Sequence, residues 1–248
     1  MDASEEIKAP LLSYEKVRIS HGNYTVIDGV TFTIDSGDFV FLTGSTGTGK
    51  SSIMRTIYGD MKISDGKASV LGYNLREIKK KQIPELRRQL GIIFQDYKLL
   101  GNKTVRQNLY FCLKATGQKD RKKADERIDE ILSAVALEGK DDKLPSELSG
   151  GEQQRAAIAR AIINKPKIIL ADEPTGNLDF TSAMNITSLL KRLSDEGTAV
   201  IMSTHSSEII NNFKARTYLC KDHSFEEITS PCVPSESDNQ TEDRKEDQ

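Results

Sequence analysis

The chain has 248 residues, 37% of them hydrophobic and 29% charged, with 17 glycines and 7 prolines. This composition suits one large α/β domain or two small ones, and it excludes a collagen, a coiled-coil rod, a disulfide-rich miniprotein and a wholly disordered chain. Lys and Arg number 35 against 37 Asp and Glu, a net charge of −2, so no overall bias points to nucleic acid or a membrane as partner.

The cysteines indicate a protein of a reducing compartment, and the apolar runs are too short to indicate a membrane span. Cys112, Cys220 and Cys232 are an odd number without metal-ligand spacing, which favours inert free thiols. No run approaches the roughly 18 apolar residues of a membrane span. The first ten residues carry acids rather than the basic start of an export signal, so a cytoplasmic protein is expected.

Residues 7–42 predict short β-strands. Residues 30–34 alternate apolar side chains with Thr, as in a half-buried strand, and residues 39–42 form a continuous apolar run, as in a strand covered on both faces. The turn cluster at 35–38 joins them.

A glycine-rich segment follows the second strand and opens a helix. Residues 44–51 fit the pattern G-x-x-x-x-G-K-[ST], whose backbone N–H groups converge on phosphate oxygens. In this pattern Lys50 reaches the β and γ phosphates and the Ser51 hydroxyl ligates Mg²⁺. The residues expected to bind the phosphates are Gly44, Ser45, Thr46, Gly47, Thr48, Gly49, Lys50, Ser51 and Ser52.

The middle of the chain predicts helices. Residues 76–140 contain little strand signal, and residues 122–137 carry apolar side chains at the spacing of a helix with one buried stripe. We expect a helical insertion over about 86–165, placed between two halves of a core at 7–85 and 166–228.

Residues 148–153, LSGGEQ, predict a helix start with an unusual second property. Ser149 and Glu152 form a capping box, and two glycines in the first turn leave the backbone open to a close ligand. Because the chain already has one phosphate loop, this second anion site is best explained as acting on a nucleotide bound to another subunit.

Two further covered strands complete the pattern. Residues 168–171 are apolar and end in Asp172 and Glu173, and burial of unpaired acids is costly unless a metal or ligand uses them. Asp172 is expected to hold Mg²⁺, and Glu173 to polarise the water that attacks the γ-phosphate. A strand at 199–202 follows another helical stretch, which favours a parallel sheet with crossover helices. Residues 229–248 lack periodic apolar residues and predict a disordered acidic tail.

Taken in order, the phosphate loop, LSGGEQ, the LADEP strand and the later His205 resemble the ATP-binding cassette (ABC) ATPases over residues 7 to about 225. The resemblance implies an α/β fold, with a P-loop NTPase (RecA-like) parallel sheet core, an antiparallel β subdomain and a helical insertion. It implies ATP hydrolysis by a head-to-tail homodimer that sandwiches two ATP molecules.

The same resemblance assigns roles to individual residues. Gln95 matches a glutamine that senses Mg²⁺ and joins the core to the insertion, Asp179 an acid at the dimer interface, and His205 a histidine on the γ-phosphate. Ser149 and Gly151 would contact the other subunit's nucleotide. The position that commonly stacks an aromatic ring on adenine holds His21, with Val26 beside the ribose; Tyr24 is the alternative.

Within the family, the segment after Gln95 and the string ELSGGEQQRAAIARAIINKP most resemble the ATPases of bacterial cell division. That resemblance implies an integral membrane partner and control of peptidoglycan hydrolases outside the cell, with the ATPase peripheral on the inner face of the membrane. Subunits of lipoprotein-releasing or macrolide exporters are the alternative. DNA-associated relatives separate these motifs by long coiled coils, so no nucleic-acid partner is expected.

The near-zero net charge hides a basic block. Residues 76–127 hold 15 Lys or Arg against 6 Asp or Glu, a balance of +9. This block is either a solvated helical face or a surface that meets anionic lipid headgroups beside the membrane partner.

Overall fold

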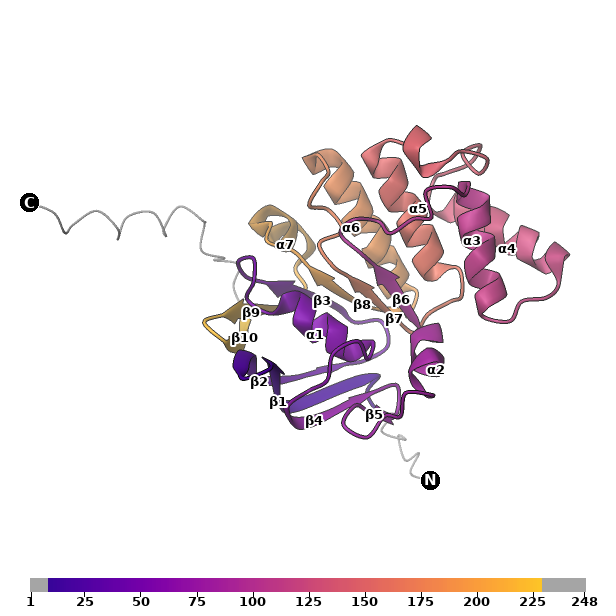
Figure 1. Cartoon of the computed structure of the whole chain (residues 1–248). Helices are drawn as coiled ribbons and strands as arrows, with labels where there is room; N and C mark the ends of the chain where they lie inside the picture. The colour runs from indigo at the N-terminus through magenta and orange to yellow at the C-terminus, as the bar shows by residue number, and fades with distance from the viewer. Residues whose placement is uncertain (1–8, 229–248) are drawn as a thin grey trace, which may run out of the picture.

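Two sheets and the helices around them form the computed structural model, which describes residues 9–228 (Figure 1). The strands are β1 (Leu12–His21), β2 (Tyr24–Ile34), β3 (Phe39–Thr43), β4 (Asp65–Val70), β5 (Tyr73–Asn74), β6 (Leu90–Ile93), β7 (Ile168–Ala171), β8 (Ala199–Ser203), β9 (Arg216–Lys221) and β10 (Ser224–Ile228). The helices are α1 (Lys50–Ile57), α2 (Ile83–Arg88), α3 (Val105–Ala115), α4 (Arg121–Ala134), α5 (Gly150–Ile162), α6 (Phe180–Asp195) and α7 (Ser207–Phe213), with a 3-10 turn at Pro145–Glu147.

The larger sheet has the order β10-β9-β3-β8-β7-β6, in which every pair is parallel except β10 with β9. All residues of β3, β7 and β8 are buried, because helices cover one face and the second sheet with α1 covers the other. The continuous apolar runs at 39–42, 168–171 and 199–202 therefore predicted strands of a parallel sheet, and that prediction is confirmed.

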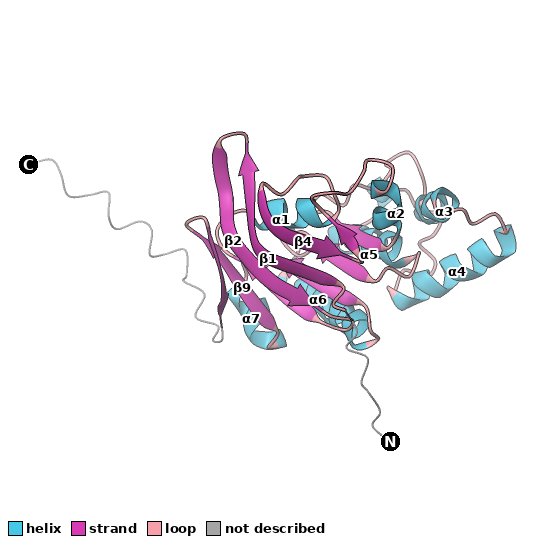
Figure 2. Ribbon diagram, turned by 90° about the horizontal axis from the view of Figure 1, so that it is seen from below, coloured by secondary structure: helices cyan, strands magenta, loops and turns pink. Residues whose placement is uncertain are grey.

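The smaller sheet, β2-β1-β4-β5, is antiparallel, and all of its strands come from the N-terminal third of the chain (Figure 2). Its inward side chains, such as Ile19 and Ile27, share one core with Val40 of β3 and Ile53 of α1. The helix that follows the phosphate loop is thus packed between two sheets, which holds its N-terminus in place.

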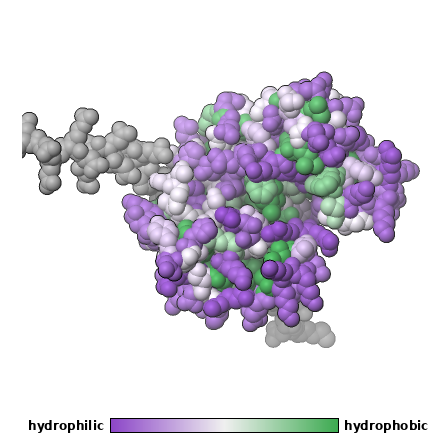
Figure 3. Space-filling model, in the orientation of Figure 1, coloured by the Kyte–Doolittle hydropathy of each residue, from purple (hydrophilic) through white to green (hydrophobic). Residues whose placement is uncertain are grey.

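Helices α3, α4, α5 and α6 share a second core with the other face of the parallel sheet. The apolar stripe predicted for residues 122–137 is confirmed, since Ala124, Ile128, Ile131 and Leu132 of α4 are buried there. In the view of Figure 3 the visible surface is largely hydrophilic, with apolar residues near its middle.

One strand was missed by the sequence prediction. β6 pairs with β7 in the parallel sheet, with Leu90 opposite Ile168, although it falls in the stretch judged poor in strand signal and inside the helical insertion expected from about 86. It is an edge strand of four residues, LGII, and Gly91 interrupts the continuous apolar run that predicted β7, a strand of the same length.

The structure also bears on the predicted free cysteines, two of which lie among the described residues. Cys112 and Cys220 are free, and burial raises the pKa of the Cys220 thiol to about 12, which makes it unreactive. Cys232 and the predicted tail at 229–248 lie outside the described residues. Over residues 9–228, none of the helices has the combination of length and apolar character needed to traverse a bilayer.

Candidate functional site

Four neighbouring parallel strands end at the same edge of the sheet, and each delivers one predicted site segment. β3 leads into residues 44–51, β8 into His205, β7 into Asp172 and β6 into Gln95. Crevices at the carboxyl ends of such strands are where open α/β sheets bind ligands.

The phosphate loop curls over the start of α1. Gly44 has φ +133°, and a Cβ there would lie 2.1 Å from the Cys220 carbonyl oxygen of β9, so only glycine fits. The Lys50 ammonium donates to the carbonyl oxygens of Gly44 at 2.5 Å and Ser45 at 2.8 Å, across the loop. Gly49, the N-cap of α1, offers no side-chain acceptor, so the helix keeps amide groups for an anion.

A chain of hydrogen bonds connects the phosphate loop with the acids after β7. The Ser51 hydroxyl donates to Asp172 Oδ1 at 3.1 Å, and the Ser203 hydroxyl donates to the same oxygen at 2.8 Å. The backbone N–H of Glu173 in turn donates to Ser203 Oγ at 2.8 Å. Ser203 is fully buried, so this hydroxyl ties the metal-ligand candidate to the predicted general base.

Glu173 has an uncommon backbone conformation. Its φ is +44°, in the left-handed region that costs a non-glycine residue about 1–3 kcal/mol and persists only where neighbours enforce it. The bond to Ser203 is one such constraint. His205 Nδ1 lies 3.6 Å from Glu173 Oε2, so the structure brings these two candidates together.

Gln95 reaches the same place from β6. A Cβ built on Gly176 would lie 3.6 Å from Glu173 Oε2 and 3.9 Å from Gln95 Nε2, so both side chains converge on that glycine. The backbone N–H of Asp172 donates to the Ile93 carbonyl at 2.9 Å, which fixes the acid pair relative to the exit of β6. Gln95, Asp172, Glu173 and His205 thus occupy one end of the sheet with the phosphate loop.

The LSGGEQ segment lies elsewhere. Ser149 accepts from the Glu152 N–H, and Glu152 accepts from the Ser149 N–H, so the predicted capping box is confirmed. These bonds and Lys140 lower the pKa of Glu152 to about 2. The α5 helix packs on β6, three strand spacings from β3, or about 14 Å. At the start of the helix, the neighbours of Gly150 and Gly151 are Tyr97, Leu178 and Ser182 rather than residues of the phosphate loop.

Asp179 caps α6 by accepting from the Ser182 N–H at 3.0 Å, and bonds from Ser182 lower its pKa. Its segment packs on the start of α5: a Cβ on Gly150 would lie 3.8 Å from Leu178, and one on Gly151 3.8 Å from the Ser182 hydroxyl. Asp179 therefore belongs with Ser149 on one surface.

The nucleobase candidates lie on the β1–β2 hairpin. His21 and Tyr24 are opposite each other across the turn and both are exposed, and Val26 Cγ1 would lie 3.2 Å from a Cβ on Gly49 of the phosphate loop. Tyr24 meets His223 edge-on at 5.5 Å between ring centroids, and His223 Nδ1 lies 3.1 Å from the Val26 carbonyl oxygen.

Two residues of this region were missed by sequence reasoning. Ser203 is the polar end of an apolar strand, the same signal that singled out Asp172, so the pattern was available. His223 lies in the turn between β9 and β10 and reaches the hairpin only because the chain folds back, which no local pattern indicates.

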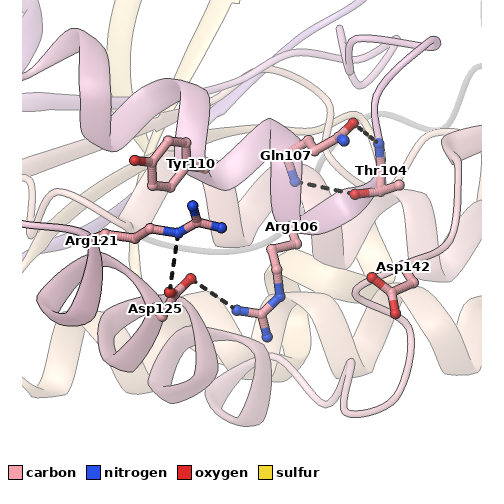
Figure 4. Close-up of a pocket in the computed structure, with 7 residues that line it drawn as sticks. All are labelled: Thr104, Arg106, Gln107, Tyr110, Arg121, Asp125 and Asp142. Atoms are coloured by element: carbon pink, nitrogen blue, oxygen red, sulfur yellow. Dashed lines mark hydrogen bonds and ion pairs between the residues drawn. The ribbon is translucent and has the colours of Figure 1, made fainter.

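A separate cavity of about 360 Å³ lies between α3 and α4 (Figure 4). Arg106 borders it and makes ion pairs with Asp125, Asp129 and Asp141, which join α3 to α4 and to the loop before the 3-10 turn. Thr104 and Gln107 cap α3 reciprocally at its rim. This cluster stabilises the helical part and lies away from the strand ends.

Comparison with known proteins agrees with this arrangement. Residues 27–176, more than half of the chain, match the family model described as ABC transporter. The chain is 46% identical over 192 residues to the cell division ATP-binding protein FtsE of Streptococcus pneumoniae, covering 77% of this chain and 83% of that protein. It is 38% identical to FtsE of Escherichia coli over 216 residues, covering 86% and 96%.

The fold agrees as well. A dimeric, post-hydrolysis structure of the ATP-binding cassette MJ0796 bound to ADP and Pi matches with a TM-score of 0.78 and 29% identity, over 87% of this chain and 98% of that chain. The order of motifs, the sheet topology and these matches lead to one conclusion: this chain belongs to the ABC transporter ATPase family and is similar to its cell-division members.

Proposed function

We propose that this ATPase works as a head-to-tail homodimer with an integral membrane protein resembling FtsX, and that the complex controls peptidoglycan hydrolases in bacterial cell division. The observation that carries the ATPase mechanism is the hydrogen-bonded chain Ser51–Asp172–Ser203–Glu173, which links the phosphate loop to the candidate general base.

The phosphate loop would bind the triphosphate of ATP. Lys50 already points its ammonium across the loop, so β and γ phosphate oxygens would replace the carbonyls of Gly44 and Ser45 as its acceptors. The amide groups of residues 44–52 and the N-terminus of α1 add hydrogen bonds and positive potential. These interactions hold the γ-phosphate at the ends of β7 and β8.

The neighbouring oxygens suit Mg²⁺. Ser51 Oγ and Asp172 Oδ1 lie 3.1 Å apart, and hydroxyl, carboxylate and the Gln95 amide oxygen are the hard ligands that this ion prefers beside phosphates. The described residues contain no group of three His, Cys, Asp or Glu that could hold a metal ion. When bound, the ion would offset the phosphate charge.

Glu173 is the proposed general base. Its carboxylate lies at the mouth of the site, where it can accept a proton from a water that attacks the γ-phosphorus. His205, 3.6 Å from it, would donate to the γ-phosphate. The bond to Ser203 fixes the backbone of Glu173 and so aims the carboxylate.

The topology supports the dimer. The residues nearest Gly150 and Gly151 are Tyr97, Leu178 and Ser182, and none of them belongs to the phosphate loop of the same chain. A second copy in head-to-tail orientation would bring its α5 N-terminus and Asp179 to the γ-phosphate. Loss of that phosphate on hydrolysis removes the shared contact, so the closed state is favoured only with ATP.

The nucleobase would lie against the β1–β2 hairpin. We retain His21 as the stacking residue with Val26 beside the ribose, since Val26 packs on the phosphate loop. An ATP dissociation constant that is unchanged by His21→Ala and raised by Tyr24→Ala would assign the contact to Tyr24 instead.

The membrane partner would dock on the segment between Tyr97 and Asn108. This segment continues from Gln95 into α3, and Leu100 and Phe111 expose large apolar side chains there. We place the start of the helical insertion after Ile93, since β6 lies in the sheet. Crosslinking from Lys98 should capture the partner; labelling confined to the opposite face of the sheet would contradict this docking site.

We also propose lipid contact by the basic block, but fewer of its bases are available for this contact than the charge count suggests. Seven of its 15 bases pair with acids in the described chain: Arg76, Arg87, Lys98, Arg106, Arg121, Lys122 and Arg127. Of the other eight, seven are exposed and would carry any attraction to anionic headgroups: Lys79, Lys80, Lys81, Arg88, Lys114, Lys119 and Lys123. Membrane binding without the partner that does not weaken with salt would contradict it.

The decisive experiment replaces the proposed base. Purified protein with Mg-ATP should hydrolyse ATP, and Glu173→Gln should abolish turnover and trap an ATP-bound dimer, detected by size-exclusion chromatography with light scattering. A Glu173→Gln protein that hydrolyses at the full rate would refute the mechanism.

A further inference from the structure

One arginine fastens the segment after β6 to α5. Arg160 Nη2 donates to the Tyr97 carbonyl oxygen at 2.7 Å, and Nη1 donates to the Lys98 carbonyl oxygen. The guanidinium is half-buried, and its pKa is lowered by that burial, with no carboxylate nearby to offset it. The charged group is thus partly removed from water, and two backbone carbonyls accept its hydrogen bonds in place of water.

The segment it holds is strained. Tyr97 and Lys98 have φ values of +59° and +49°, both in the left-handed region that non-glycine residues avoid. The planar fork of an arginine binds two adjacent acceptors at once, which a lysine ammonium does less well. Arg160 therefore stabilises the one backbone conformation in which both carbonyls face α5.

The same segment touches α5 at a second point. The Tyr97 hydroxyl lies 3.6 Å from the Cβ position of Gly150, the first residue of the helix. Arg160 follows ten residues later, or about 15 Å along the axis. Tyr97 therefore contacts α5 through both its backbone carbonyl and its ring hydroxyl, and these two contacts restrain the segment from rotating independently of the helix.

We propose that Arg160 is a positioning residue that makes Gln95–Lys98 and α5 move as one body. The proposal rests on the dimer of the proposed function. Ser149, at the start of α5, would contact the partner's nucleotide, while Gln95 contacts its own. When Ser149 closes on the partner's nucleotide, α5 would then move Gln95 of the same subunit into place at that subunit's own nucleotide. Through this shared movement, Arg160 couples the two ATP sites.

The test uses a single tryptophan as reporter, because the chain has none. Lys98→Trp is introduced with Glu173→Gln, and emission is recorded as ATP is added. Into this protein we introduce Arg160→Met, Arg160→Lys or Arg127→Met. Arg127 is a matched control: its guanidinium also binds two successive carbonyls, those of Ile162 and Ile163, but at the far end of α5.

We expect ATP to change the emission in the parent and in Arg127→Met, and the change to be at least fivefold smaller in Arg160→Met, with Arg160→Lys between. ATP affinity and the trapped dimer should persist in all. In otherwise wild-type protein, Arg160→Met should lower kcat about tenfold with KM within twofold, and Arg127→Met should leave kcat unchanged.

An undiminished emission change in Arg160→Met would overturn the proposal, as would equal losses in Arg127→Met. No change in the parent, although its dimer forms, would also overturn it, because the segment would not follow α5. Failure of the Glu173→Gln parent to dimerise with ATP is a different result, which refutes the proposed function itself.

Discussion

Ser203→Ala tests whether the hydrogen-bonded chain positions Glu173, the proposed general base. The substitution removes one buried hydroxyl that accepts from the Glu173 N–H and donates to Asp172, and it leaves β8 otherwise intact. A neutral bond contributes about 1 kcal/mol and one to a carboxylate about 1.5–3, so the loss in unfolding free energy should be about 2.5–4 kcal/mol. For a domain of this size that lowers Tm by about 5–15 °C.

The control is Ser194→Ala. Ser194 is equally buried, and its hydroxyl donates a single 2.7 Å bond to the Gly37 carbonyl, remote from the strand ends. It should cost about 1 kcal/mol and leave kcat within twofold of wild type. Ser203→Ala should lower kcat at least tenfold at a temperature where both variants are folded, measured by phosphate release, because the strained Glu173 loses a constraint. A Ser203→Ala enzyme with wild-type kcat would refute the positioning argument, whatever its Tm.

Three more predictions follow from other parts of the structure. The pKa of Glu152, about 2, lies below the unfolded value of about 4.3. The folded chain thus binds fewer protons, and this stabilisation is present above about pH 4.5 and is lost as pH falls toward 2. Glu152→Gln keeps the capping box, so its stability deficit, from urea unfolding, should shrink between pH 7 and pH 3; a constant deficit would contradict the shift. Arg106→Met should destabilise the chain by about 1–3 kcal/mol in low salt and less in 1 M NaCl, because it removes the ion pairs with Asp125, Asp129 and Asp141; a salt-independent loss would contradict the ionic account. Phe180 and Phe111 are 53% and 54% exposed, so alanine at each removes a similar apolar surface. Phe180→Ala, beside Asp179, should weaken the ATP-trapped Glu173→Gln dimer about tenfold, and Phe111→Ala should weaken only capture of the membrane partner; the reverse pattern would disprove the assignment of the two surfaces.

Local patterns were enough to predict most of the sheet and the phosphate loop. Continuous apolar runs predict fully buried strands, and the capping box at Ser149 depends on residues only three apart. β6 could not be predicted in the same way, because Gly91 interrupts its short apolar run. Its position is set by pairing with β7, which is about 75 residues away in sequence.

The candidate site shows the same division. Lys50, Ser51, Asp172 and Glu173 follow strands directly, and the motif predicted that they would meet. The contribution of Ser203 depends on β7 and β8 being neighbours with Ala171 opposite Met202, which is a tertiary fact. The left-handed backbone of Glu173 and the arginine fork on Tyr97 and Lys98 also come from contacts between distant segments, which the sequence does not display.

The distance between the phosphate loop and Ser149 within one chain makes subunit complementation informative. A mixed dimer that carries Lys50→Ala in one subunit and Ser149→Arg in the other would have one composite site with both defects and one with neither. If both defects are in the same subunit, a wild-type partner cannot restore either site. If the proposed head-to-tail dimer is correct, the proportion of active sites in mixed populations should depend on whether the two substitutions lie in the same subunit or in different subunits.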